Sequence, residues 1–305
     1  MTDNPIRELL DLCGTEVPVY QAGLGGIAGP ELAAAVSEAG GLGHLGGIRL
    51  SALELRDRIR ATRAATDRPF GVNLVPPGGG PDGFESQLAV VLEECPRVLS
   101  LFWGDFAAVI PRAKAAGIVT MVQVGSRGEA VKAARDGADV IIAQGLEAGG
   151  HVRSVVGLMA LLPAVVDAVL PKPVLAAGGI GDPRAVRAAL ALGAAGVWVG
   201  TRFVASGESL AHDIYKQRLV EAGTDDTAHS HLYSYGWRFG APHRALRGEN
   251  KLDPLRLIAG GARRGDKASH ARRIRLYAGQ GVGAIADSPP AAEIVRRLGA
   301  AHLPA

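Results

Sequence analysis

The chain has 305 residues, which is long enough for one large α/β barrel or for two smaller domains. Hydrophobic residues make up 48% and charged residues 21%, as in ordinary soluble globular proteins. The formal net charge is only +3 and aromatic residues reach 5%, which argues against a nucleic-acid-binding surface.

The cysteine content and the lengths of the apolar runs indicate the cellular compartment in which the protein is expected. Cys13 and Cys95 lack metal-binding spacing and suggest no disulfide framework. The first ten residues, MTDNPIRELL, contain no signal-peptide core, and the longest apolar run, 155–166, is too short to span a bilayer. We therefore expect a cytoplasmic protein with no membrane partner and no metal site.

In chain order, short apolar runs alternate with amphipathic, alanine-rich segments. The runs predict buried strands at 17–22, 42–45, 70–75, 98–102, 118–124, 140–143, 173–177 and 196–199. The segments between and after them predict helices at 30–39, 52–65, 84–94, 106–116, 127–136, 158–169, 183–192 and 205–222. Apolar strands that alternate with helices indicate a parallel sheet. Eight such units predict an α/β fold, a (β/α)8 TIM barrel, with a doubly wound open sheet as the alternative.

The pattern changes after residue 222, so we expect a barrel at 1–222, a cover segment at 223–268 and barrel-closing helices at 269–305. The cover segment holds four aromatic residues without a helical period: Tyr233, Tyr235, Trp237 and Phe239. They favour an ordered cover over the barrel mouth. We interpret the basic run Arg263, Arg264, Lys267, Arg272, Arg273 and Arg275 as a solvated helix face.

The stretch at 138–152, ADVIIAQGLEAGGHV, ends a buried strand in two glycines and a histidine. Gly149 and Gly150 permit a close backbone approach, and His151 belongs to the residue type that titrates near neutral pH. We predict that a flat ligand lies on these glycines with His151 acting as an acid or base beside it. A sharp turn with a solvated histidine is the alternative.

Two more glycine-rich stretches follow the predicted seventh and eighth strands, AGGIGD at 177–182 and GVWVGT at 196–201. In such barrels these loops often bind phosphate through backbone N–H groups, although tight packing of small residues would need the same sequence. The G-x-G-x-x-A match at 23–28 lacks the acidic residue of a dinucleotide site, so we interpret it as a backbone edge against a ring system. Asn73 and Gln123 end strands and are candidate partners of a flavin ring, whereas His44 is assigned a structural role.

Six segments together resemble one enzyme family: PVYQAGLGGIAGPELAAAVSEAGGLGHLGG, GVNL, QGLEAGGHV, VLAAGGIGD, GVWVGTRF and YAGQGVGAI. The likeness to the nitronate monooxygenases, formerly 2-nitropropane dioxygenases, runs from about residue 18 to residue 285. It implies a TIM barrel that binds FMN, with His151 as the catalytic base. It also places the cofactor against Ala22, Gly23, Asn73, Gln123, Glu147, Ala148, Gly149, Gly150, Ala177, Gly178, Gly179, Val199, Gly200, Thr201, Tyr277, Gln280 and Gly281.

The implied reaction converts an alkyl nitronate, or a nitroalkane, and O2 into a carbonyl compound and nitrite. NAD(P)H-dependent FMN enoyl-acyl-carrier-protein reductases share much of the same motif set and give the alternative activity. A third hypothesis is a protein that binds flavin but catalyses no reaction. Trp198, where many members carry Gln, and the opening QAGL depart from the family pattern near the flavin. These departures leave the substrate open, and the sequence leaves a homodimer open.

Overall fold

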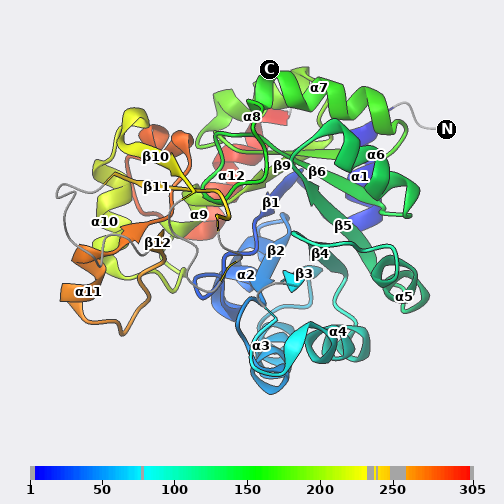
Figure 1. Cartoon of the computed structure of the whole chain (residues 1–305), viewed down its shortest axis with the longest axis horizontal. Coiled ribbons are helices and arrows are strands. Elements are labelled where there is room, and N and C mark those ends of the chain that lie inside the picture. The colour runs from blue at the N-terminus through cyan, green and yellow to red at the C-terminus, as the bar shows by residue number, and fades with distance from the viewer. Residues whose placement is uncertain (1–3, 77–78, 232–236, 238–239, 248–258, 303–305) are drawn as a thin grey trace.

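The computed structural model describes residues 4–76, 79–231, 237, 240–247 and 259–302. Their main feature is an eight-stranded parallel sheet in the order β1-β9-β8-β6-β5-β4-β3-β2 (Figure 1). A parallel bridge between Tyr20 and Leu42 joins its two end strands and closes the sheet into a cylinder. The fold is therefore a TIM barrel, and the open sheet is excluded.

The barrel strands and the helices between them confirm the predicted units up to residue 199, with small shifts at their ends. The strands are β1 (Val19–Gln21), β2 (Gly43–Gly46), β3 (Phe70–Leu74), β4 (Val98–Leu101), β5 (Val119–Val124), β6 (Val140–Gln144), β8 (Val174–Ala177) and β9 (Gly196–Val199). The helices are α2 (Pro30–Glu38), α3 (Ala52–Ala65), α4 (Gly83–Glu94), α5 (Val109–Ala115), α6 (Arg127–Arg135), α7 (Leu158–Val169) and α8 (Pro183–Ala191).

A helix that the sequence analysis did not predict, α1 (Pro5–Cys13), closes the amino-terminal end of the barrel. The Asn4 side chain accepts a hydrogen bond from the Ile6 N–H at 3.0 Å and caps this helix. Leu9 and Cys13 are fully buried in the cluster that fills the barrel interior. Burial raises the pKa of the Cys13 thiol to about 12, so this cysteine is a packing residue.

The prediction of a single helix at 205–222 is wrong, because two shorter helices occupy this region. They are α9 (Thr201–Val204) and α10 (Asp213–Glu221). Between them the Ser209 hydroxyl donates to the Val204 carbonyl at 2.6 Å, and the His212 ring accepts from the Ile214 N–H at 3.1 Å. These side chains satisfy the exposed helix ends and replace a continuous helix.

The cover segment forms a second sheet at the mouth of the barrel. Strands β10 (Thr227–Ser230) and β11 (His243–Leu246) form an antiparallel pair, and β11 also pairs with β7 (Gly150–His151). Figure 1 shows β10 and β11 with α10 to one side of the barrel, opposite α5. The remaining elements are η2 (Thr224–Asp226), β12 (Ala259–Gly260), α11 (Ala268–Arg273), β13 (Arg275–Leu276), η4 (Gln280–Ala284), α12 (Ala291–Gly299) and η5 (Ala300–His302).

Helix α12 confirms the predicted closing helix and packs against α2, α8 and β1. Ile294, Val295 and Leu298 are buried there in the cluster between strands and helices. Among the residues that the structure describes, no helix is both long and apolar enough to cross a membrane.

Candidate active site

A cavity of about 590 Å³ opens at the carboxyl ends of the barrel strands, where such barrels place their ligands. Loops after most of the strands, β7 and the cover segment line it. Of the residues predicted for the site, it brings together Ala22, Gly23, Asn73, Gln123, Ala148, Gly149, Gly150, His151, Ala177, Gly178, Gly179, Val199, Gly200, Thr201, Tyr277 and Gly281.

Two predicted cofactor residues, Glu147 and Gln280, do not line the cavity. Both oxygens of the Glu147 carboxylate accept from the Leu158 N–H, at 2.9 Å each, at the start of α7. The Gln280 N–H donates to the Glu147 carbonyl at 2.9 Å. These two residues therefore tie the loop after β6 to α7 and to the C-terminal segment, one layer away from the cavity wall.

The glycines after β8 adopt backbone conformations that side chains disfavour. Gly178 has φ +111° and Gly179 has φ +71°. A Cβ atom on Gly149 would lie 2.4 Å from the Gly279 nitrogen, and one on Gly281 would lie 2.7 Å from the Gly179 oxygen. Bare backbone from three loops thus forms one wall of the cavity, as expected where a ligand lies close to main-chain groups.

The two predicted amides also line the cavity. Asn73 is 7% exposed, and its Nδ2 donates to the Ser100 hydroxyl at 3.0 Å. A Cβ atom on Gly23 would lie 2.1 Å from the Asn73 Cβ, so only glycine fits beside this side chain. Gln123, at the end of β5, is half-buried and faces the same cavity.

His151 lies on β7, which pairs with strand β11 of the second sheet, so the alternative of a sharp turn with a solvated histidine is wrong. Its ring is largely buried, with 7% of the residue exposed. Its Nε2 lies 3.2 Å from the Tyr277 hydroxyl. The Gln144 amide donates to the His151 carbonyl at 2.9 Å and fixes the strand against the barrel.

Burial is the main cause that lowers the pKa of His151 to about 3, and the neighbouring His243 lowers it further. Burial also raises the pKa of the Tyr277 phenol to about 12. At neutral pH the site therefore presents a neutral imidazole beside a protonated phenol. This pair can accept a proton from a bound molecule and donate a hydrogen bond to it.

Two tryptophans enclose the imidazole. Trp237, from the cover segment, stacks on the His151 ring with 3.6 Å between ring centroids and 27° between planes. Trp103 meets both rings edge-on, at 6.3 Å from His151 and 5.7 Å from Trp237. Trp237, one of the four aromatics predicted for the cover, therefore lies against the imidazole, whereas the other three, Tyr233, Tyr235 and Phe239, lie outside the described residues.

Sequence reasoning missed several polar residues of the cavity wall, among them Arg49, Arg263, Asp266 and His270. Arg49 follows β2 with φ +63°, an unusual conformation for a residue with a side chain. Arg263 and His270 reach the wall from the cover and α11. The interpretation of the basic run as one solvated helix face is therefore wrong, since Arg263 precedes α11 and faces the cavity. An arginine in the loop after a strand was the available signal for Arg49.

The nitronate monooxygenase family model matches residues 7–82 and 75–300. A nitronate monooxygenase of Pseudomonas aeruginosa is 34% identical, and the alignment covers 98% of each chain. Two relatives are named as (3aS,4S,5R,7aS)-5-hydroxy-7a-methyl-1-oxo-octahydro-1H-indene-4-carboxyl-CoA dehydrogenases, from Rhodococcus jostii and Mycobacterium tuberculosis. Each is 40% identical, over 78% and 79% of this chain, which spans 65% and 66% of their respective lengths.

Solved structures give the same picture. FabK from Thermotoga maritima superposes with a TM-score of 0.84 and 33% identity, over 96% of this chain and 95% of FabK. A nitroalkane oxidase from Streptomyces ansochromogenes gives a TM-score of 0.82 and 33% identity, over 96% of each chain. FabK and the nitroalkane oxidase thus share this barrel.

Proposed function

Since this chain belongs to the nitronate monooxygenase family of oxidoreductases, we propose that it is an FMN-dependent nitronate monooxygenase. The substrates would be an alkyl nitronate, or its parent nitroalkane, and O2, and the products a carbonyl compound and nitrite. The observation that carries the proposal is the His151–Tyr277 pair, 3.2 Å apart, which faces a glycine-walled cavity at the barrel mouth.

The residues of the cavity fit FMN. Its volume of about 590 Å³ lies in the range of cofactor sites. The left-handed backbone at Gly178 and Gly179, with Gly200 and Thr201 directly after β9, would hold the phosphate through main-chain groups. Asn73 and Gln123 would hydrogen-bond the ring system. FMN, when bound, supplies the oxidation of the substrate and the reaction with O2.

His151 would act on the substrate as a base. The neutral imidazole can take the proton next to the nitro group of a neutral nitroalkane. A nitronate anion beside it favours the protonated imidazole, since an opposite charge nearby raises the pKa of a histidine. Trp237 and Trp103 exclude water from this side of the ring, which strengthens the attraction between imidazolium and anion.

A second candidate is an NAD(P)H-dependent enoyl-thioester reductase. FabK and the CoA-ester dehydrogenases are among the similar proteins, and this likeness favours the second candidate. Anaerobic addition of NADH or NADPH to the yellow protein separates the two functions. Rapid, saturable bleaching followed by reduction of an enoyl thioester favours the reductase, and slow bleaching with fast nitronate turnover favours the monooxygenase.

The first test is the visible spectrum of the purified protein, followed by turnover of a nitronate and its nitroalkane. We expect His151→Asn to keep FMN and to lose at least about 100-fold in nitroalkane turnover, the usual contribution of a general base. Nitronate turnover should fall less, because a nitronate has already lost the proton that His151 would remove from the nitroalkane. His302→Asn, in η5 away from the cavity, is the control. Full nitroalkane activity in His151→Asn would refute the assignment.

A further inference from the structure

A second, smaller cavity of about 120 Å³ adjoins the main one, and the proposed reaction does not use it. We call this space the side cavity. Buried apolar side chains form one part of its lining: Phe106, Ile110, Val122 and Ala133. Charged side chains of α6, together with Arg153, form another part. The buried part can take a hydrocarbon chain, because apolar groups leave water favourably for such surroundings.

The side cavity and the main cavity share a wall. Gln123 lines both cavities, and the consecutive residues Phe102 and Trp103 line the main cavity and the side cavity respectively. The Trp103 ring also meets the rings of His151 and Trp237 edge-on, with 6.3 Å and 5.7 Å between centroids. Both of these rings belong to the wall of the main cavity. Trp103 therefore lies between the imidazole and the side cavity.

The backbone of Trp103 is strained. Its φ of +61° lies in the left-handed region, which a residue with a bulky side chain rarely adopts. A glycine at this position would avoid the strain. Strained residues of this kind are concentrated at active sites and at ligand-binding sites. The chain thus keeps an indole between the two cavities despite an unfavourable backbone conformation.

The indole of Trp103 is held by packing and not by a hydrogen bond. Its Nε1 atom is shielded from solvent and has no hydrogen-bond partner among the residues that the structure describes. The Phe102 ring meets the indole edge-on at 5.6 Å, and the Arg153 Cζ atom lies 5.3 Å from the ring centroid. A smaller side chain in place of Trp103 would therefore break no hydrogen bond and would open the wall between the two cavities.

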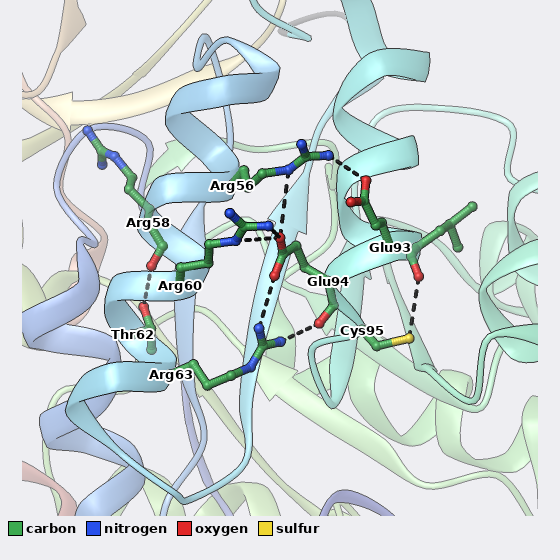
Figure 2. Close-up of polar contacts among 9 residues, drawn as sticks. Arg56, Arg58, Arg60, Thr62, Arg63, Glu93, Glu94 and Cys95 are labelled. Atoms are coloured by element: carbon green, nitrogen blue, oxygen red, sulfur yellow. Dashed lines mark hydrogen bonds and ion pairs between the residues drawn. The ribbon is translucent and has the colours of Figure 1, made fainter.

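The arginines of α3 show how Arg153 differs from an arginine in a surface ion pair. Figure 2 shows Arg60 and Arg63 of α3 turned toward Glu94 on α4, where their ion pairs join two helices. Arg153 is held in a similar way by Glu129 of α6, whose carboxylate accepts from the Arg153 Nε at 2.8 Å. The Arg153 guanidinium also lies over the indole, so this pair fixes the ring in the wall.

We propose that Trp103 determines substrate size: it closes the side cavity and limits the alkyl chain that fits beside His151. The reacting carbon would lie at the imidazole, and the alkyl chain of the nitronate would end against the indole. The wild type would then favour short-chain nitronates, and a smaller residue at position 103 would let a longer chain enter the side cavity. This inference rests on the proposed function, whose substrate class it narrows.

The test compares kcat/KM for ethyl, butyl and hexyl nitronate in the FMN-loaded full chain. We expect Trp103→Ala to raise the ratio of hexyl to ethyl nitronate by at least about tenfold, since each methylene that leaves water contributes about fourfold. Trp103→Phe, which keeps a ring in the wall, should give a smaller rise. A ratio between two substrates does not respond to a general loss of activity or stability, so it separates a size limit from a purely structural role.

A third variant and two controls complete the comparison. Arg153→Gln should raise the same ratio by about two- to fivefold, because it removes the cation–π contact that holds the indole. Arg60→Gln removes an arginine that only joins α3 to α4, and Phe84→Ala removes an aromatic ring of α4 that lines neither cavity. Both controls should stay within about twofold of the wild type. An unchanged ratio in Trp103→Ala, or an equal rise in Phe84→Ala, overturns the inference.

Binding of unreactive anions separates this inference from the proposed function. Propanoate and heptanoate match ethyl and hexyl nitronate in length and charge, and each is titrated calorimetrically into the wild type and Trp103→Ala. We expect the affinity for heptanoate relative to propanoate to rise by at least about tenfold in the variant. If this rise is seen while no nitronate is turned over, the proposed function is wrong and the role of Trp103 stands. If nitronates are turned over without this rise, the role of Trp103 is wrong and the proposed function stands.

Discussion

At the scale of single residues, two buried histidines show how position divides structural from chemical roles. His44 is fully buried inside the barrel, edge-on to Trp198 at 4.5 Å, and neither ring nitrogen has a hydrogen-bond partner among the described residues. His151 is nearly as buried but lies at the cavity wall beside Tyr277. Burial lowers the pKa of each to about 3. Of these two histidines, only His151 can contact a substrate.

The lowered pKa values predict a loss of stability in acid. Between pH 6.5 and pH 3 the unfolded chain binds protons at these histidines and the native protein does not, so the free energy of unfolding falls as pH falls. At pH 5 each histidine accounts for about 2 kcal/mol. His44→Leu should reduce the loss between pH 7 and pH 5 by about that amount, measured by urea denaturation at both values. An unchanged loss would contradict the prediction, because packing effects act equally at both pH values.

At the scale of elements, the loop after β6 is held against the C-terminal segment with no room for a side chain. A Cβ atom on Gly149 would lie 2.4 Å from the Gly279 nitrogen, a backbone atom that cannot rotate away. We expect Gly149→Ala to lower the free energy of unfolding by about 1–3 kcal/mol, as overpacking does, and to weaken FMN binding.

The control for Gly149→Ala is Gly128→Ala in α6, where a Cβ atom would meet nothing within 4 Å. Alanine is the better helix former, so this variant should gain up to about 1 kcal/mol. Thermal unfolding with and without added FMN measures both effects. Equal melting temperatures for the two variants would show that the close approach is not maintained in solution.

The sequence predicted the elements whose signals are local. Apolar runs located the barrel strands, and the glycines after β8 and β9 located a wall of the cavity. The sequence did not predict pairings between residues that lie far apart in the chain. Nothing near His151 indicates that a two-residue strand pairs with β11, and the basic composition around Arg263 masks its place at the cavity. The break between α9 and α10 depends on side-chain hydrogen bonds that apolar periodicity does not register.

At the scale of the whole molecule, the two ends of the chain support one barrel. Helix α12 packs against α2 and β1 from the start of the chain, and α1 fills the barrel floor (Figure 1). We expect Ile294→Ala, in the buried face of α12, to lower the free energy of unfolding by about 2–5 kcal/mol. Far- and near-ultraviolet circular dichroism should report one coincident transition, because the barrel cannot close without both ends.

Arg296→Ala on the same helix provides the comparison. Its side chain is 71% exposed and pairs with Glu293 at the surface, so its removal should change stability by less than about 1 kcal/mol. Two separate transitions in Ile294→Ala, one for each end of the chain, would mean that the ends fold independently.

The pairing of β7 with β11 determines when the reaction centre can form during translation. Arg244 of β11 bonds the Leu146 carbonyl from 98 residues further along the chain. When the ribosome has translated the eight barrel strands, it has therefore not yet produced the strand that orients the imidazole. The nascent polypeptide would acquire a finished reaction centre only as its last third emerges, and that same stretch supplies α12, which packs against the start of the chain.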